Sequence, residues 1–253
     1  IVNTYKPFPY KKKLISTFLK KKSFNSKNKH EKLYIFMFLI VFFFTTGILT
    51  TISAQKRWTA EVYGGIADNF RTPLVIQQTG YPDIRFTAGY YTRSLELPIY
   101  YGYRIGTWYN KNLFELELNH HKIYLFNNPP EVTSFNVSHG INMLTLNYGK
   151  EYRDMIFKFG AGTVIAHPEF KIRDVSFDNT RGLFKQGYMP GGIALNLAVA
   201  HQFRFSKRFF LNTEFKTTFA YTKLTQDNLT VKVYNAALHF CFGPGYNMII
   251  RDK

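Results

Sequence analysis

Residues 114–119 read FELELN, and the alternation of apolar and polar side chains in this stretch decides the fold class. Its two leucines and its phenylalanine fall on one face of an extended strand, opposite Glu115, Glu117 and Asn119. A period of two is typical of a β-strand whose faces meet different environments. The chain from Trp58 onward therefore favours an all-β fold.

The same alternation recurs along the rest of the chain, with no sustained 3.6-residue stripe. Eight segments carry it, near residues 57–66, 98–109, 113–126, 140–151, 155–167, 192–205, 209–222 and 230–242. Most are longer than the usual strand of about five or six residues. They suit a tilted strand that crosses a bilayer, which needs about 9–11 residues.

The connections alternate between long and short, which is the sidedness of an outer-membrane barrel. Three connections are long, at residues 67–97, 127–139 and 168–191. The connections between them are tight, as at Arg153-Asp154. We predict an eight-stranded antiparallel transmembrane β-barrel with long surface loops and periplasmic turns. A soluble sandwich also alternates, so strand length, loop sidedness and abundant Tyr and Phe decide between the two.

The polar faces hold equal numbers of acids and bases, which suits a packed polar lumen. An eight-stranded barrel is just wide enough for side chains to fill, and buried charges need partners. The predicted lumen charges are Glu61, Arg104, Glu115, Glu117, Lys158, Arg204, Glu214 and Lys216. We expect these residues to be structural and the barrel not to be a pore.

Residues 1–54 have the order of an export signal with a basic upstream extension. A Lys-rich segment precedes the uncharged run LYIFMFLIVFFFTTGIL at 33–49, and TISAQ follows it. We predict cleavage after Ala54, which leaves residues 55–253 as the barrel domain. The alternative is a retained anchor helix, since the run is at the lower limit of a spanning helix.

Composition narrows the functional classes. The net charge is +17, of which +9 lies in residues 1–32 and +8 in residues 55–253. No recognisable nucleic-acid-binding module accompanies this charge, so we expect no nucleic-acid partner. Cys241 is the single cysteine, which excludes a disulfide scaffold. We expect a monomer in contact with outer-membrane lipid.

Standard catalytic motifs are missing, so the histidines are the candidate functional residues. His120, His121, His139 and His167 fall toward the outward ends of neighbouring strands, whereas His201 and His239 fall toward the periplasmic ends. Converging imidazoles can bind a transition metal or move protons. The alternative is that these side chains are polar rim residues at the height of the lipid headgroups.

Three neighbouring stretches carry a family resemblance. They read PIYYGYRIGTW (98–108), FELELNHHKIY (114–124) and SHGINMLTLNY (138–148). This order resembles the bacterial lipid A oxidase-related outer-membrane barrels, in which a YYG-x-R strand precedes an acidic strand ending in an H-x-K-like element and then an HG-x-N-x-L strand. The resemblance implies a protein of the Gram-negative outer membrane that oxidises the glucosamine sugar of lipid A with molecular oxygen.

Under that implication the candidate catalytic residues are His121, His139, Lys122 and Asn142, with Glu117 and Arg104 beneath them. His121 and His139 would hold a transition metal or relay protons, and Lys122 would meet a lipid phosphate. Two hypotheses stay open. One is a structural or binding barrel that uses its surface loops, and the other is this lipid A-modifying enzyme.

The predicted topology can be tested on whole cells. In a Cys241→Ala background, Asp178→Cys should react with an impermeant thiol reagent, because the loop at 168–191 is expected on the cell surface. Labelling that needs a permeabilised outer membrane would reverse the topology.

Overall fold

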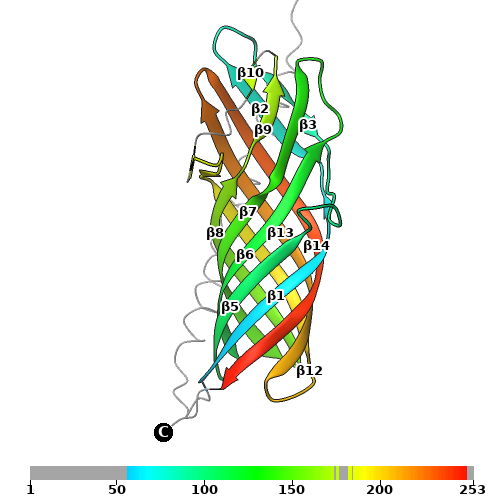
Figure 1. Ribbon diagram of the computed structural model, residues 1–253, viewed down its shortest axis with the longest axis vertical. Helices are drawn as coiled ribbons and strands as arrows, with labels where there is room; N and C mark the ends of the chain where they lie inside the picture. Colours follow the sequence, from blue (N-terminus) through cyan, green and yellow to red (C-terminus); the bar gives the residue numbers. More distant parts are fainter. Residues whose placement is uncertain (1–55, 174, 177–181, 184, 250–253) are drawn as a thin grey trace, which may run out of the picture. The chain divides into compact units, whose positions relative to one another are not determined.

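The computed structural model describes residues 56–173, 175–176, 182–183 and 185–249 (Figure 1). The predicted signal segment and Asp178 lie outside the described residues. Within them, no helix is long and apolar enough to cross a membrane.

Eight long strands form a closed antiparallel barrel. They are β1 (Lys56–Asn69), β5 (Tyr101–Tyr109), β6 (Asn112–Leu125), β7 (Val132–Tyr152), β8 (Met155–Ala166), β12 (Ile193–Arg204), β13 (Phe209–Gln226) and β14 (Leu229–Ile249). Each pairs with the next around the ring, and β14 pairs back with β1. The predicted eight-stranded barrel is confirmed.

The barrel has a lower end, with the tight turns after β5, β7 and β12, and an upper end, with the longer connections and the tight turn between β13 and β14. Short strands occupy these upper connections: β2 (Thr72–Gln78), β3 (Ile84–Ala88), β4 (Tyr90–Tyr91), β9 (Glu169–Ile172), β10 (Val175–Ser176) and β11 (Met189–Pro190). β2 pairs with β14, and β9 pairs with β7, so the wall continues upward (Figure 1). The prediction of long loops was therefore wrong over much of their length.

The wall is apolar outside and polar inside over its lower part. Leu116 is 45% exposed on the outer face, between Ile105 and Leu146 of the neighbouring strands. Glu115 and Glu117, on the same strand, are buried inside. A soluble protein has its apolar side chains inside and its polar side chains outside, whereas here the order is reversed. This is the arrangement of a barrel that spans a membrane, with lipid as the outer solvent.

Strand β13 shows where the membrane ends. Its outer face runs upward from Phe215 and Phe219 to Tyr221, and then to the exposed Lys223 and Thr225. Its inner face runs the opposite way, from buried charged and polar residues at 214–218 to the buried Leu224. The outer face thus becomes polar where the inner face becomes apolar, and an aromatic residue marks the change, as in an interfacial girdle.

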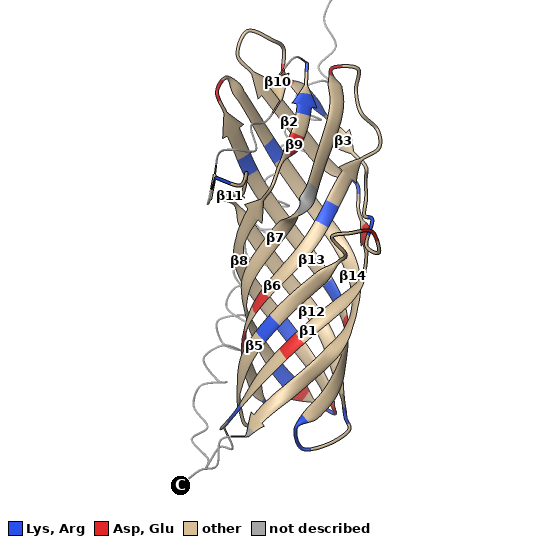
Figure 2. Ribbon diagram, viewed as in Figure 1, with Lys and Arg blue, Asp and Glu red and all other residues tan. Residues whose placement is uncertain are grey.

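The lumen consequently has three zones, so the prediction of a polar lumen holds only for the middle one. Trp108, Leu113, Ile156 and Ala200 form an apolar floor at the lower end. The buried charged residues lie above this floor along the same strands, and Figure 2 shows charged bands in the lower half of the barrel. Above them a large apolar core joins the upper barrel strands to β2, β3 and β9.

Strand β14 continues seven residues beyond the predicted end at Phe242, to Ile249. The sequence GPG interrupts the alternation there and hides the strand. Gly245 is required by packing, because a Cβ at this position would lie 2.0 Å from the ring of Phe210.

The assignment of the two faces gives a stability prediction. Leu116→Arg places a charge in lipid and should lower the free energy of unfolding by about 2–4 kcal/mol if the site is near the bilayer midplane. Thr225→Arg, on the outer face above the aromatic residues, is the matched control and should cost little. Urea titrations of the protein folded in lipid vesicles measure both. An equal cost for the two variants would contradict the assignment.

Candidate functional site

Arg104 is the centre of the charged zone of the lumen. Its Nη1 donates to Glu61 Oε1 at 2.6 Å, and its Nη2 donates to Glu117 Oε1 at 3.0 Å. Nη2 also donates to Glu214. The guanidinium lies 4.0 Å from the ring centroid of Tyr63. One side chain from β5 thereby connects β1, β6 and β13 across the interior.

Two lysines complete this network. Lys216 Nζ lies 2.6 Å from Glu117 Oε1, and Lys158 Nζ lies 2.8 Å from Glu214 Oε2. Lys158 also reaches Glu115 Oε1 at 3.2 Å. Because every cation has a carboxylate partner and these side chains are buried, the network fills the lumen instead of offering a site.

The lumen was predicted to hold four acidic and four basic residues, and one of the predicted basic residues does not lie in it. Arg204 lies at the lower end of β12, where its exposed guanidinium meets Glu151 at 3.4 Å. Within the described part of the lumen, four carboxyl groups therefore face three cations. Asparagines supply the remaining donors: Asn212 bonds to Glu61, and Asn147 and Asn196 both bond to Glu117.

Two histidines lie on the inner face above the charged zone. The ring centroids of His121 and His239 are 5.1 Å apart. His239 Nδ1 is 2.9 Å from the Tyr100 hydroxyl, and its Nε2 is 2.8 Å from Thr218 Oγ1. The predicted position of His239 near the periplasmic end was therefore wrong, because β14 is longer than its pattern suggests.

His121 has one nitrogen available. Its Nε2 is 2.9 Å from Asn69 Oδ1, a carbonyl oxygen, so Nε2 carries the proton and donates. Its Nδ1 is buried and has no hydrogen-bond partner among the described residues. A metal needs more ligands than one imidazole, and the described residues contain no group of three or more His, Cys, Asp or Glu placed to hold one.

The neighbouring histidine faces the other way. His120 stacks on Tyr101, with ring centroids 4.7 Å apart, and its Nδ1 is 2.8 Å from Asn142 Oδ1. These three residues are cross-strand neighbours on β5, β6 and β7. Because Ile141 and Met143 are buried inside, Asn142 belongs to the outer face.

Lys122 also belongs to the outer face of β6, where the segment between β4 and β5 covers it. Its Nζ donates to the Glu96 carbonyl at 2.9 Å. His139 lies in β7 at a register shift opposite β6, and its side chain lies outside the described residues.

The predicted catalytic residues therefore occupy two compartments. His121 is inside the lumen, whereas Lys122 and Asn142 are outside the wall. Their catalytic and metal-binding roles stay predictions. Sequence reasoning missed Tyr100 and His239 as neighbours of His121. The buried side of the alternation in β14 was the signal for His239, whereas Tyr100 lies just before its strand and follows no such pattern.

Comparisons with known proteins found no family model and no curated protein sequence that matches the chain. Among solved structures, the outer membrane protein AlkL is 11% identical with a TM-score of 0.42, over 81% of this chain and 95% of that one. OprG from Pseudomonas aeruginosa is 12% identical with a TM-score of 0.41, over 78% and 98%. Ail of Yersinia pestis is 9% identical with a TM-score of 0.32, over 78% and 100%.

These superpositions are loose, so the strand pairings described above carry the assignment of the fold. Nothing among these structures points to a lipid A oxidase.

The lumen network gives a second stability prediction. Arg104→Met leaves three carboxylates without their shared cation, and breaking a buried ion pair in this way costs about 3–5 kcal/mol. Arg85→Met is the control, because it removes only the exposed pair with Asp83 and should change stability little. Denaturant titration in vesicles compares them. Similar stabilities for the two variants would mean that water reaches the network.

Proposed function

We propose that this chain is a non-conducting barrel of the Gram-negative outer membrane that carries an extracellular binding platform. The upper platform consists of β2, β3, β9 and β10 with the upper ends of β7, β13 and β14. The barrel anchors the platform, and the platform contacts a partner at the cell surface.

The filled lumen supports an anchoring role instead of transport. The apolar floor, the charged network and the upper core lie one above the other within a single barrel. An eight-stranded barrel leaves little free space even before such residues are added. A solute would have to displace paired charges as well as two apolar layers.

The core of the upper platform is the observation that carries the proposal. Loops that only connect strands need no core of their own, and they stay mobile and variable. Here, Leu74 and Ile76 of β2, Phe170 of β9 and Leu224 of β13 belong to one buried cluster. The apolar core fixes the shape of the surface outside it, which is what a preformed binding surface requires.

A groove at the outer end of the upper platform is the candidate contact. It measures about 520 Å³, and Tyr81, Asp83, Glu131 and Arg173 are among the residues that line it. The Arg173 guanidinium lies 4.4 Å from the ring centroid of Tyr81. Hydrogen bonds from Arg85 and Gln77 hold the pKa of Asp83 below its usual range. Tyrosine and arginine are enriched at protein interfaces, so the contact between Tyr81 and Arg173 suits a recognition surface.

The platform role predicts contacts that depend on position. A photo-crosslinking phenylalanine in place of Tyr81 should give adducts on whole cells, because Tyr81 is exposed beside the groove. The same residue in place of Tyr152, exposed at the lower turn, should not give those adducts. Planar-bilayer recordings should show no stepwise current. A conducting channel together with no adduct at position 81 would contradict the proposal.

A lipid A-modifying enzyme of the oxidase type is the second candidate. One observation favours it: the hydrogen-bonded pair His120–Asn142 faces outward, where the sugar of an outer-leaflet lipid would lie. His139 would be a catalytic or metal-binding group. The family resemblance described above gives His121 the same role.

Mass spectrometry of lipid A tests this second candidate. Cells that make the wild type should show a mass change that His120→Ala and His139→Ala abolish, because a methyl group cannot replace an imidazole that binds a metal or passes a proton. Gel electrophoresis with and without heating checks that both variants fold, because a folded barrel changes its migration when heat unfolds it. Identical lipid A from wild-type and empty cells under aerated growth would exclude this activity.

A further inference from the structure

The segment between β4 and β5 leaves the barrel wall and returns to it. β4 pairs with β6 at Tyr124 and Leu125, and β5 pairs with β6 from His120 downward. The two strands therefore follow the same edge of β6. Residues 92–100 connect them as an outward excursion, which is named the lateral loop here.

The tip of the lateral loop is the most exposed apolar surface of the described wall. Leu95 is 82% exposed and Leu97 is 89% exposed, and Ile99 follows on the same segment. Large exposed apolar side chains grouped on one segment mark a contact with another apolar phase or partner. The barrel wall beside the loop faces lipid, and its outward side chains Ile66 and Tyr103 are exposed as well.

Hydrogen bonds to the wall and within the loop hold the base of the lateral loop in place. Ser94 Oγ accepts from the Ala67 amide at 3.2 Å, and the Ser94 carbonyl accepts from the Tyr100 amide at 2.8 Å. Lys122 Nζ donates to the Glu96 carbonyl at 2.9 Å. The base of the loop is thus fixed on both flanking strands, Tyr100 is buried inside the wall, and the leucine side chains are left exposed outside it.

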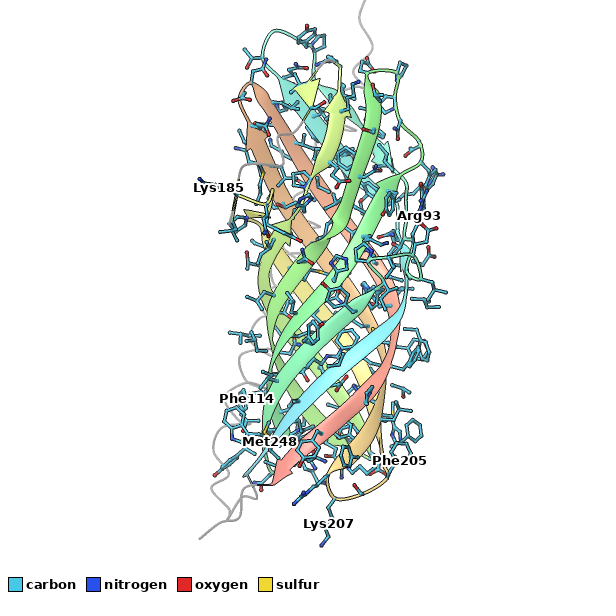
Figure 3. All side chains as sticks on the ribbon, viewed as in Figure 1. Arg93, Phe114, Lys185, Phe205, Lys207 and Met248 are labelled. Atoms are coloured by element: carbon cyan, nitrogen blue, oxygen red, sulfur yellow. The ribbon has the colours of Figure 1, made fainter. Side chains whose placement is uncertain are left out.

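A cation and two aromatic rings lie beside this tip. The rings of Tyr91 and Tyr124 stack with centroids 5.4 Å apart. The Arg93 guanidinium lies 5.4 Å from the first centroid and 5.0 Å from the second. Figure 3 shows Arg93 on the outer flank of the barrel. Arg93 also pairs with Glu96 at 3.1 Å, and both side chains are largely exposed.

We infer that the lateral loop is an interfacial anchor that binds an anionic lipid of the surrounding leaflet. Leu95, Leu97 and Ile99 insert among the acyl chains, the tyrosine pair lies at the interface, and Arg93 meets the lipid phosphate. The order of apolar, aromatic and cationic groups matches the order of layers in a leaflet. A phospholipid or a lipid A phosphate presents the same chemistry to Arg93.

Depth-dependent quenching tests the insertion. The full barrel, as Cys241→Ala with Leu95→Cys, is labelled with an environment-sensitive dye and folded in phosphatidylcholine vesicles that contain doxyl-labelled lipid. The dye at position 95 should be quenched. The same dye at Thr225→Cys, exposed above the membrane, should not be quenched. Gel electrophoresis with and without heating confirms that both proteins are folded.

The same probe tests recognition of the phosphate. Replacing doxyl-phosphatidylcholine by doxyl-phosphatidylglycerol should enrich the quencher at position 95 by up to about fivefold, the equivalent of about 1 kcal/mol for a cation near an anionic surface. Arg93→Gln should remove this enrichment and leave quenching by phosphatidylcholine intact. Lys207→Gln, an exposed cation at the lower turn after β12, should change neither.

Three results would overturn the inference. One is a dye at position 95 that no doxyl lipid quenches. Another is an enrichment by phosphatidylglycerol that Arg93→Gln leaves unchanged. The last is protection of position 95 that grows with protein concentration, because the occupant would then be a second copy of the chain. A lipid A phosphate in place of phosphatidylglycerol distinguishes the two lipid sources in the same assay.

Discussion

The hydrogen bonds and ion pairs of Arg104 are the interaction on which the rest of the barrel depends. An eight-stranded barrel encloses a width that side chains alone fill. Any charge placed there must find its partners among other side chains, since little water is present to solvate it. Arg104 meets carboxylates from β1, β6 and β13, so one guanidinium connects strands that lie on different sides of the ring. Sheet closure and lumen packing therefore support each other.

The outer solvent imposes a second constraint. In the lower part of the barrel the lipid requires an apolar exterior, and the polar residues are confined to the inside. In the upper part water is the outer solvent, and the interior becomes an ordinary apolar core. β13 obeys both rules within one continuous strand, because its two faces exchange character near Tyr221. The upper platform needs no separate domain, since the barrel strands extend into it.

Much of this architecture could be predicted from the sequence, for a physical reason. A strand that separates lipid from a polar lumen must alternate, and FELELN does so without exception. The failures occur where that rule stops applying. Residues 72–78 form β2, but the segment is short, begins with Thr-Pro and lies above the membrane. Beyond Phe242, small inward residues such as Gly245 replace polar ones, so the continuation of β14 gives no alternating signal.

The candidate site was harder to predict, because the environment of each side chain depends on which face of the wall it occupies. His120 and His121 are adjacent in sequence and lie on opposite sides of the wall, so one imidazole meets lipid-facing residues and the other meets the lumen. Lys122 was expected to be available at the rim, but the lateral loop covers it. Such coverage depends on the path of residues 92–100 outside the wall, which the alternation of residue types does not indicate.

The exchange of faces along β13 also has a mechanical consequence. A wall whose exterior changes from phenylalanine to lysine within a few residues resists sliding along the bilayer normal in either direction. Hydrophobic mismatch then sets the depth of the protein, and the bilayer adjusts its local thickness to the barrel.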